Sequence, residues 1–400
     1  MSTFRGPLQE FPGVSVDQFE GVNRESVLFF LSHCHTDHMR GLEIAEPLPG
    51  PLYVSEISAV ILRKRYPHLH DIRVLEIGVE TAIRVNGEEV HVTTLPAGHC
   101  PGSVMLLFES PKIRVLYTGD FRLRLKDIEN LRVLQGIRGN VDIVYLDSTF
   151  LRRDYAMFPS RVNSTNEIIR YIEEWIRQSP DHVVSLKTPG RYGQEYLFKE
   201  IHRRTGRSLH VDVTNLSNYA HIPDMDGVVT IDGSKCQIHA CWEFCHCLKG
   251  GTKKIRTIKP TAMIWKNYKL SDGISQQISE TFVRVCYSSH SSYEEIRDFI
   301  LFLRPQRVEL NVIPDAVDAR AEMFRLLREI LSECQSGIPE GSAVSARGET
   351  VYCPPENVQE VKEISFKNIK FRGVKKNVDF DELSGNIERI PKRKKTTQTT

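Results

Sequence analysis

The first 150 residues alternate short hydrophobic runs with Gly, Pro and Asp, a pattern that predicts a packed sheet system. Predicted strands lie at residues 27–31, 89–95, 104–108, 113–117 and 143–146. The polar motifs with candidate chemistry follow directly after such runs. Loops at strand ends are where a rigid scaffold usually presents functional groups. We therefore expect a functional site that is built from several of these loops.

After residue 150 the spacing of the hydrophobic positions becomes helical. Apolar side chains recur at helical spacing over residues 168–176, and Ser164 with Glu167 has the pattern of a capping box at the start of this helix. A predicted strand at 182–187 and a helix at about 194–203 follow. This alternation of strand and helix predicts an α/β insertion.

The last part of the chain changes from a periodic to a polar pattern. A helical stretch begins at Tyr293 and leads into a predicted strand at 308–313. Beyond about Glu333 the chain is polar, and we expect a mostly disordered tail. The tail ends in the basic run 392–395, which is typical of a nuclear-localisation or nucleic-acid-binding patch but also occurs in solvated tails.

Composition narrows the class of protein without deciding its partner. The chain has 400 residues, of which 40% are hydrophobic and 26% charged, an ordinary globular balance. A net charge of +2 neither supports nor excludes nucleic acid, so any basic surface must come from local clustering. No apolar run reaches the roughly 18 residues of a membrane span, and the start lacks the pattern of a secretory signal.

The central motif is Ser32-His33-Cys34-His35-Thr36-Asp37-His38, which places four candidate metal ligands directly after a hydrophobic run. Histidine and carboxylate suit Zn²⁺, and a catalytic site needs them to converge with one position open. Two later residues at strand ends complete the set, His99 in a Gly/Pro turn and Asp120 in a Thr-Gly-Asp turn. The predicted first zinc ligands are His33, His35 and His99; the second metal would be held by Asp37 and His38, with Asp120 as the bridge.

This order of motifs resembles the metallo-β-lactamase fold, an α/β protein built as an αββα sandwich. The sequence strings at residues 97–105, 116–122 and 145–150 narrow the resemblance to the β-CASP nucleases of the SNM1 group. The resemblance covers roughly residues 1–330. It implies a metallo-β-lactamase domain at 1–152, a β-CASP insertion at 153–289, a return to the first domain at 290–334, and the polar tail at 335–400.

The resemblance also implies roles for three further residues. Asp147 matches an acidic β-CASP motif, and His290 matches the last histidine motif at the active site. Asp17 matches an acidic residue beneath the metal loop. The insertion would cap the metal cleft and form one wall of a DNA groove.

A second cluster of soft ligands lies in the insertion, where His239 and Cys241 are followed by Cys245 and Cys247. Structural zinc sites are closed and four-coordinate. We predict such a site with His210 as the remaining ligand and favour Cys247 over Cys245. A chance cluster of reduced thiols is the alternative.

Substrate contacts are predicted from turn-forming and basic segments. Ser103 lies in a Gly-rich turn whose backbone N–H groups suit an anion. Lys187 and Tyr192 belong to one basic turn of the insertion and Lys259 to another segment. We expect these four residues to contact substrate phosphates, although solvated surface charge is the plain alternative for each lysine.

The resemblance implies a nuclear, zinc-dependent DNA nuclease with 5′–3′ exonuclease activity and endonuclease activity on hairpins and overhangs in non-homologous end joining. It further implies one or two active-site metals, with Mg²⁺ or Mn²⁺ as a possible second ion. DNA ends are the expected substrate, end-joining kinase and ligase factors the expected partners, and a monomer the expected state. A 5′ exonuclease in telomere or crosslink repair and an RNA-processing β-CASP endonuclease remain alternatives.

Overall fold

Two stacked β-sheets form the body of the protein in the computed structural model, which describes residues 2–336 apart from 189, 191, 214, 215, 217, 218, 220, 221, 242–247 and 249–251. The first sheet is parallel, and its strands in spatial order are β1 (Val14–Val16), β2 (Leu28–Phe30), β3 (Leu52–Val54) and β4 (Ile72–Val74). The second sheet is mixed, with the order β17 (Arg307–Leu310), β9 (Ile143–Leu146), β8 (Arg114–Tyr117), β7 (Val104–Glu109), β6 (Glu88–Pro96) and β5 (Glu80–Val85).

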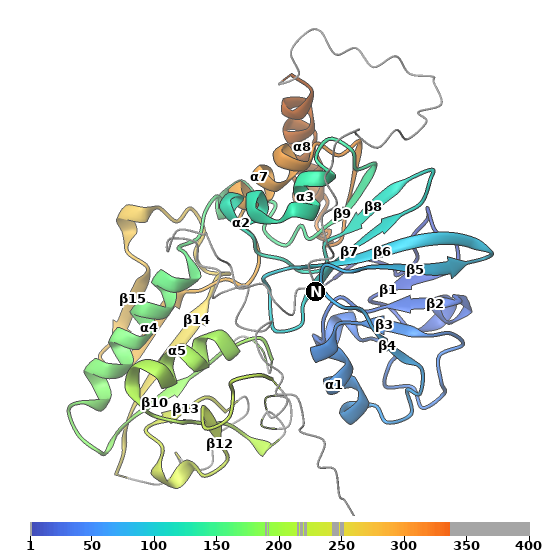
Figure 1. The fold of residues 1–400 in the computed structure, drawn as a ribbon. Helices are drawn as coiled ribbons and strands as arrows, with labels where there is room; N and C mark the ends of the chain where they lie inside the picture. Colours follow the sequence, from blue (N-terminus) through green and yellow to red (C-terminus); the bar gives the residue numbers. More distant parts are fainter. Residues whose placement is uncertain are drawn as a thin grey trace, which may run out of the picture.

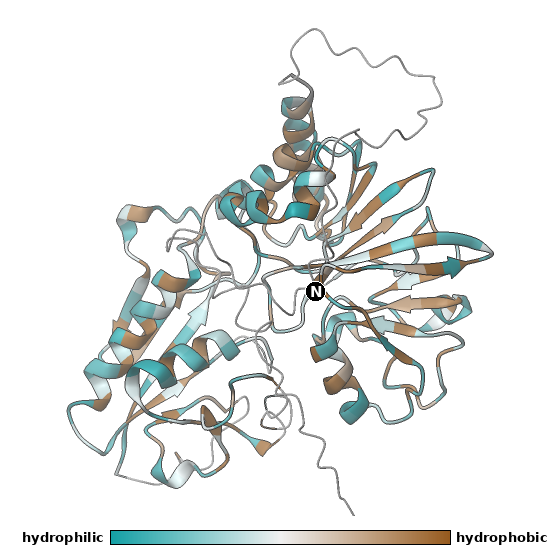
Figure 2. Ribbon diagram, in the orientation of Figure 1, coloured by the Kyte–Doolittle hydropathy of each residue, from teal (hydrophilic) through white to brown (hydrophobic). Residues whose placement is uncertain are grey.

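Strand β7 shows why its continuous apolar run folds as a central strand. Successive side chains of a strand point to opposite faces. Val104, Leu106 and Phe108 pack between the two sheets, whereas Met105 and Leu107 pack against helices on the outer face. Both faces of the strand are therefore buried, which explains why its hydrophobic residues follow one another without polar gaps. Figure 2 colours the ribbon by hydropathy, with hydrophobic residues in brown.

Helices cover the outer face of each sheet, so that the body is the expected αββα sandwich (Figure 1). Helix α1 (Glu56–Arg65) covers the first sheet. The second sheet is covered by α2 (Leu125–Asn130), α3 (Arg132–Gly136), α7 (Tyr293–Leu303) and α8 (Val317–Ser336). Ser292 and Glu295 form a capping box that starts α7 close to the metal loops.

The insertion has a sheet of its own. Its spatial order is β12 (Val229–Thr230), β11 (Leu209–His210), β13 (Ile238–His239), β10 (His182–Leu186), β14 (Lys254–Thr261), β16 (Phe282–Cys286) and β15 (Ser275–Ser279). All neighbours in it are parallel except β15 and β16. Helices α4 (Arg161–Ile176) and α5 (Glu195–Thr205) lie beside this sheet (Figure 1). The insertion limits of 153–289 stay a prediction.

Helix α4 begins earlier than its sequence pattern indicates. The predicted capping box at Ser164 is wrong, because Ser160 is the N-cap and its side chain accepts a hydrogen bond from the Asn163 amide. Ser164 is buried inside the helix instead. The predicted apolar face is correct, since Ile168, Ile172 and Trp175 are all buried.

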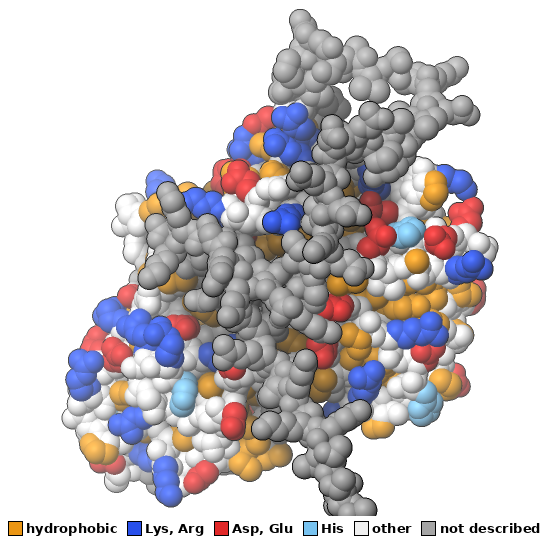
Figure 3. Space-filling view, in the orientation of Figure 1, with side chains coloured by type: hydrophobic (Ala, Val, Ile, Leu, Met, Phe, Trp, Pro, Cys, Tyr) orange, Lys and Arg blue, Asp and Glu red, His pale blue; other side chains and the backbone are white. Residues whose placement is uncertain are grey.

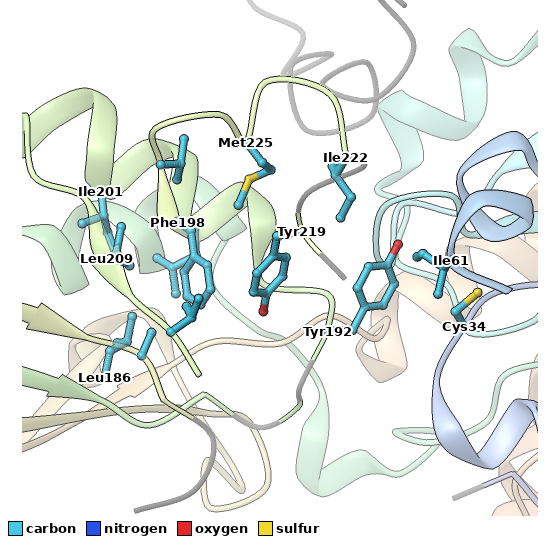
Figure 4. Close-up of a cluster of buried hydrophobic side chains, with 14 of the residues drawn as sticks. Cys34, Ile61, Leu186, Tyr192, Phe198, Ile201, Leu209, Tyr219, Ile222 and Met225 are labelled. Atoms are coloured by element: carbon cyan, nitrogen blue, oxygen red, sulfur yellow. The ribbon is translucent and has the colours of Figure 1, made fainter. Parts of the chain in front are cut away.

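The carboxyl ends of two parallel strands of the insertion lead to residues at the metal loops of the body. Strand β10 leads to Tyr192, and β16 leads to His290. The hydrophobic core is continuous across this junction, where Figure 4 shows Tyr192 between side chains of the insertion and Cys34 with Ile61 of the body. Ligand sites of parallel sheets usually lie at such carboxyl ends.

The short 3-10 helices are η1 (Gly21–Glu25), η2 (Thr36–His38), η3 (Arg153–Tyr155), η4 (Gly233–Lys235) and η6 (Leu270–Asp272).

Candidate metal centre

Loops that follow four different strands bring the predicted metal ligands together at one edge of the sandwich. Strand β2 ends just before His33, and the short helix η2 carries Asp37 and His38. His99 follows β6, and Asp120 follows β8. Strand β16 of the insertion leads to His290. Rigid strands thus fix the origin of each loop, while the loops supply the functional groups.

Three imidazole nitrogens converge at the centre of this cluster. Nδ1 of His35 lies 3.0 Å from Nε2 of His33 and 3.0 Å from Nε2 of His99. Oδ2 of Asp120 lies 3.5 Å from Nε2 of both His33 and His99. These four residues form a group whose ligand atoms all lie within 4.8 Å of one another.

The outer nitrogen of each of these histidines has a hydrogen-bond acceptor. Nε2 of His35 lies 3.0 Å from the Tyr192 carbonyl oxygen, and Nδ1 of His99 lies 2.9 Å from the Ser289 carbonyl oxygen. A carbonyl can accept but not donate, so each outer nitrogen carries the proton. The inner nitrogens therefore present lone pairs to one another. Such an arrangement is unfavourable by itself, and a cation bound between the nitrogens stabilises it.

Burial keeps these imidazoles neutral and ready to bind a metal. It is the main cause that lowers the pKa of His33, His35 and His99 below the ordinary value of 6.5. Metal ligation requires neutral imidazole. The buried donor set and its protonation state thus both fit a metal ion.

Asp17 holds the first metal loop from beneath. Its carboxylate accepts hydrogen bonds from the Ser32 amide at 2.7 Å and the Ser32 hydroxyl at 2.6 Å. The same carboxylate accepts from Nδ1 of His38 at 2.8 Å and the Tyr117 hydroxyl at 2.9 Å. Because the Ser32 hydroxyl donates to Asp17, its oxygen is left to accept from Nδ1 of His33, 2.9 Å away. Asp17 therefore orients two predicted ligands from their outer sides.

His38 supplies a further indication of a bound cation. Its Nε2 is buried, makes no hydrogen bond of good geometry to the residues that the structure describes, and faces Oδ1 of Asp120 at 3.3 Å, which helps to raise the pKa of His38. An orphaned buried nitrogen is costly unless something outside the protein satisfies it. Oδ2 of Asp37 lies 3.9 Å from this nitrogen and accepts a hydrogen bond from the Ser2 amide at 3.1 Å. The positions of His38, Asp37 and Asp120 suit a second metal.

His290 and Asp147 form the opposite side of the centre. Nδ1 of His290 donates to Oδ2 of Asp147 at 2.8 Å, while Thr149 donates to the other oxygen of that carboxylate through its amide and its hydroxyl. Nε2 of His290 then lies 3.9 Å from Oδ2 of Asp120. Burial alone would lower the pKa of His290, but Asp147 and Asp120 outweigh it and raise the pKa to about 9.

Comparison with known proteins agrees with this geometry. Residues 12–183 match the beta-lactamase superfamily domain, and residues 223–316 match the DNA repair metallo-beta-lactamase family. The chain is 36% identical to Artemis of Rattus norvegicus over 349 residues, which are 78% of this chain and 49% of that protein. The chain belongs to the metallo-β-lactamase/β-CASP family that includes Artemis.

Other members of the family are also similar to the chain. The 5′ exonuclease Apollo of Mus musculus is 33% identical over 291 residues, which are 70% of this chain and 50% of Apollo. The human DNA cross-link repair 1A protein is 29% identical over 334 residues, 79% of this chain and 31% of that protein. The chain thus spans about half the length of the Artemis and Apollo proteins that it matches. Within the described residues, no helix has both the length and the apolarity to cross a membrane.

The structure places two of the predicted phosphate contacts in buried positions with hydrogen bonds inside the protein. Tyr192 is buried, and its hydroxyl donates to the Pro101 carbonyl oxygen, so it is not available to a substrate phosphate. Ser103 is also buried, and its hydroxyl oxygen accepts from the amides of His99 and Cys100 at 3.2 and 3.1 Å. Both side chains hold the turn that carries His99.

The two predicted lysine contacts lie side by side. Leu186 pairs with Ile258 in the register of β10 and β14, and the Lys187 amide donates to the Ile258 carbonyl at 2.8 Å. Lys187 and Lys259 therefore leave neighbouring strands at the same level, half-buried and exposed respectively. Their contact with phosphate stays a prediction.

The predicted structural zinc site is described in part. Nδ1 of His210 lies 3.1 Å from Nδ1 of His239 and 3.3 Å from Sγ of Cys241. Nε2 of His239 donates to the Cys236 carbonyl at 3.0 Å, which leaves its Nδ1 with the lone pair. Gly233 packs on the His210 ring so closely that a Cβ would meet Nδ1 at 2.7 Å. Cys245 and Cys247 lie outside the described residues.

Some functional contacts were missed by sequence reasoning. The carbonyl groups of Tyr192 and Ser289 leave no mark in a sequence motif, because any residue type offers a backbone oxygen. Gly193 gives a weak signal. Its φ of +100° and a Cβ position 3.1 Å from Nε2 of His35 explain why glycine stands there.

Proposed function

We propose that this chain is a metal-dependent phosphodiesterase that cuts DNA. The observation that carries the proposal is the set of inward-facing lone pairs of His33, His35 and His99, held by hydrogen bonds from outside. The match of residues 223–316 to a DNA repair family supports DNA as the substrate. End processing in double-strand break repair is the reading that fits the similarity to Artemis.

Zinc is the metal that we propose for the first position. Imidazole and carboxylate ligands suit zinc at a site with an open coordination position. Such a metal supplies Lewis-acid charge and activates water near neutral pH. The second position, near His38 and Asp37, has one imidazole and more carboxylate oxygen, so Mg²⁺ or Mn²⁺ also suits it.

Asp37 is the residue that we propose to orient the attacking water and take its proton. Its side chain is 26% exposed, whereas the side chain of His38 beside it is 2% exposed. The Ser2 amide fixes one carboxylate oxygen of Asp37 at 3.1 Å. Attack on the phosphorus in line with the leaving oxygen would give a 5′-phosphate and a 3′-hydroxyl.

His290 has two candidate roles, which metal content separates. Its Nδ1 is committed to Asp147, so Nε2 is free to ligate the second metal or to protonate the leaving oxygen. If His290 is a ligand, His290→Ala lowers the metal content of the protein. If it is a proton donor, the variant keeps its metal but cuts slowly, and a better leaving group restores the rate.

Contacts with the DNA backbone are proposed for Lys187 and Lys259. Figure 3 shows Lys and Arg side chains intermixed with Asp and Glu side chains on the visible face. This mixture agrees with the small net charge of the chain, +2. The two lysines are a local exception, because the strand register places Lys187, just after β10, beside Lys259 of β14. Replacing either by Gln should weaken binding to all DNA sequences and reduce its salt dependence.

The test is cleavage of three end-labelled substrates by the wild type and by Asp37→Asn. The substrates are a DNA hairpin, 5′-phosphorylated single-stranded DNA and a matched RNA. Asp315→Asn, an exposed carboxylate outside the centre, is the control. We expect the wild type and the control to open the hairpin or trim overhangs, and Asp37→Asn to be inactive with unchanged folding.

Other outcomes would assign the chain to a different activity. Stepwise degradation from 5′ ends alone would favour a 5′ exonuclease, as the similarity to Apollo allows. Cutting of RNA alone would contradict DNA as the substrate. Action in the nucleus, a monomeric state and end-joining kinase and ligase partners stay predictions, and the basic run at 392–395 lies outside the described residues.

A further inference from the structure

An apolar turn lies next to His290 and has no part in the chemistry described above. Strands β14 and β16 run parallel with Thr261 opposite Cys286, and the Tyr287 amide donates to the Thr261 carbonyl at 3.2 Å. The two strands therefore leave the sheet side by side. One leads to His290, and the other enters the turn at residues 262–269.

The inner face of this turn is firmly held. Ala262, Trp265 and Tyr268 are buried at intervals of three residues in a cluster with Phe150, Tyr155 and Phe158. The Tyr155 hydroxyl donates to the Met263 carbonyl at 2.7 Å, and the Asn267 amide donates to the Asp154 carbonyl at 2.6 Å. The turn is therefore a rigid surface rather than a free loop.

A wall of aromatic rings connects this turn with the metal centre. The ring centroids of Tyr155 and Phe150 are 4.8 Å apart, and those of Phe150 and His290 are 6.1 Å apart in an edge-on arrangement. From the carbonyl of Met263 to His290 there are thus two intervening aromatic side chains. The turn and the metal centre therefore share one wall of packed side chains.

The outer face of the turn combines apolar and basic side chains. Met263 is 62% exposed and Ile264 is 45% exposed, while Lys266 and Lys269 are exposed beside them. Lys266 lies 3.6 Å from Asp154, a loose pair that leaves its ammonium largely in solvent. Single exposed hydrophobic residues are common. Two in succession on a rigid turn, flanked by lysines and beside a phosphodiesterase centre, are a specific combination.

A second observation concerns two buried polar atoms of the turn. Nε1 of Trp265 and the hydroxyl of Tyr268 are buried without a hydrogen-bond partner among the residues of known placement. Buried polar groups usually have a partner. Both side chains are more than nine-tenths buried and belong to the same turn as the exposed Met263 and Ile264.

We propose that this surface, defined as Met263, Ile264, Lys266 and Lys269, receives an unpaired nucleotide of the DNA strand being cut. The base packs on Met263 and Ile264, and the lysines contact the adjoining phosphates. A base has an apolar face and its phosphate a negative charge, which is the complement of this pattern. The inference deepens the proposed function and rests on it. It makes the surface a determinant of preference for unpaired over paired nucleotides beside the cut, because a paired base is already stacked on its neighbours.

The test compares Met263→Ser/Ile264→Ser with Val317→Ser, which removes an apolar side chain that is 75% exposed on α8 instead. Each protein cuts DNA of one sequence with and without unpaired nucleotides beside the cleavage position. Hydrolysis of the small diester bis(p-nitrophenyl) phosphate reports on the metal centre alone. We expect the double variant to raise KM roughly ten-fold on the unpaired substrate, to change the paired one little, and to hydrolyse the small diester normally.

Other results would overturn either this inference or the proposed function. Equal KM values for the double variant and the wild type on unpaired DNA would overturn the inference while leaving the nuclease intact. An equal loss on the small diester would show that the turn supports the centre structurally and would also overturn it. If the wild type cuts no DNA at all, the proposed function itself fails. The double variant Lys266→Gln/Lys269→Gln gives a second measurement. It should reduce the salt dependence of KM and leave the ratio of the KM values on paired and unpaired DNA unchanged.

Discussion

The two histidine clusters of this chain are built in different ways. In the metal centre, His33 and His35 on the loop after β2 converge with His99 on the loop after β6, and each has its outer nitrogen committed to a protein acceptor. In the insertion, His210 and His239 are register partners on the adjacent strands β11 and β13, so the sheet itself brings them together. Burial and the neighbouring His210 lower the pKa of His239 to about 4, which leaves it neutral.

The ligand types differ as well, with Asp120 in the metal centre and Cys241 in the insertion, while His239 too is held from outside by the Cys236 carbonyl. A catalytic centre needs its ligands fixed from outside, because an open coordination position contributes nothing to holding them. A closed structural site holds itself together through the metal. The hub at Asp17, with four hydrogen bonds to Ser32, His38 and Tyr117, is therefore a mark of the first kind of site.

The largest expected effect comes from removing a ligand of the metal centre. We expect His33→Ala to lower the rate of DNA cleavage by at least about a thousand-fold, because the metal contributes several kcal/mol to the transition state. Cleavage rates and metal content by mass spectrometry check this. The control is His91→Ala, a half-buried histidine on β6 that lies outside the metal centre. Near-normal cleavage by His33→Ala would contradict the assignment of the centre.

The support of His35 by the insertion predicts the next effect. In Gly193→Ala the new Cβ would lie 3.1 Å from Nε2 of His35 and 3.2 Å from Cβ of Cys100. We expect it to displace the Tyr192 carbonyl and to weaken metal binding roughly 10- to 100-fold, the usual range for lost outer contacts. Competition with a chromogenic chelator measures the affinity.

Gly206→Ala is the matched control for this experiment. Gly206 also has a positive φ, of +66°, but a Cβ there would meet nothing within 4 Å. Both substitutions strain the backbone, but only the new Cβ of Gly193→Ala approaches the His35 ring. Equal metal affinity in the two variants would show that the contact between Tyr192 and His35 is dispensable.

The second cluster predicts an effect on stability rather than on chemistry. We expect His210→Ala to lower the zinc content by one equivalent and to lower the melting temperature, because the metal links strands β11 and β13. Hydrolysis of a small phosphodiester should change little. Unchanged zinc stoichiometry would reject the structural site and leave a cluster of reduced thiols.

A smaller, pH-dependent effect is expected at Glu195, the first residue of α5. Its carboxyl is buried at the start of α5, and burial raises its pKa from 4.5 to about 7, although the Gly193 amide hydrogen bond opposes this. The folded state therefore disfavours the charged form. Below about pH 4.5 both folded and unfolded states are protonated and nothing is lost. As pH rises from there to about 7, the cost grows, and above 7 it is constant.

Glu195→Gln should remove this cost. We expect the variant to be more stable than the wild type by roughly 1 to 3 kcal/mol at pH 8 and equally stable near pH 4.5. Urea unfolding at the two pH values measures the difference. A variant that is destabilised equally at both would show that Glu195 contributes through its shape or its hydrogen bond with Gly193, not through its charge.

The sequence predicted the parts of the centre that are local in the chain. The segment from His33 to His38 and the strand-end positions of His99 and Asp120 needed no knowledge of the fold, and the structure brings these residues together. The αββα sandwich followed from the family resemblance. Tyr192 was noticed but given the wrong role, because its proximity to basic residues suggested phosphate, whereas burial beside Cys34 directs its hydroxyl to Pro101.

What sequence reasoning could not reach are contacts across long separations. The Tyr192 carbonyl lies 157 positions from His35, and the Ser289 carbonyl lies 190 positions from His99. Both use backbone atoms, which every residue has. The buried position of Ser103 was missed for a related reason: a Gly-rich turn suits an anion and a protein-internal hydrogen bond equally well.

The N-terminal segment is fastened to the far end of the described chain, and this affects how the protein is made. The Thr3 amide donates to the Asn311 carbonyl at 2.8 Å, the Ile313 amide donates to the Thr3 hydroxyl at 2.9 Å, and the neighbouring Ser2 amide fixes Asp37. On the ribosome, His33 emerges nearly 280 residues before Asn311 does. The N-terminal segment must therefore wait for the residues after β17, a strand of the other sheet, before these hydrogen bonds can form. Such non-local topology folds slowly, and we expect the nascent chain to depend on chaperones until β17 has been synthesised.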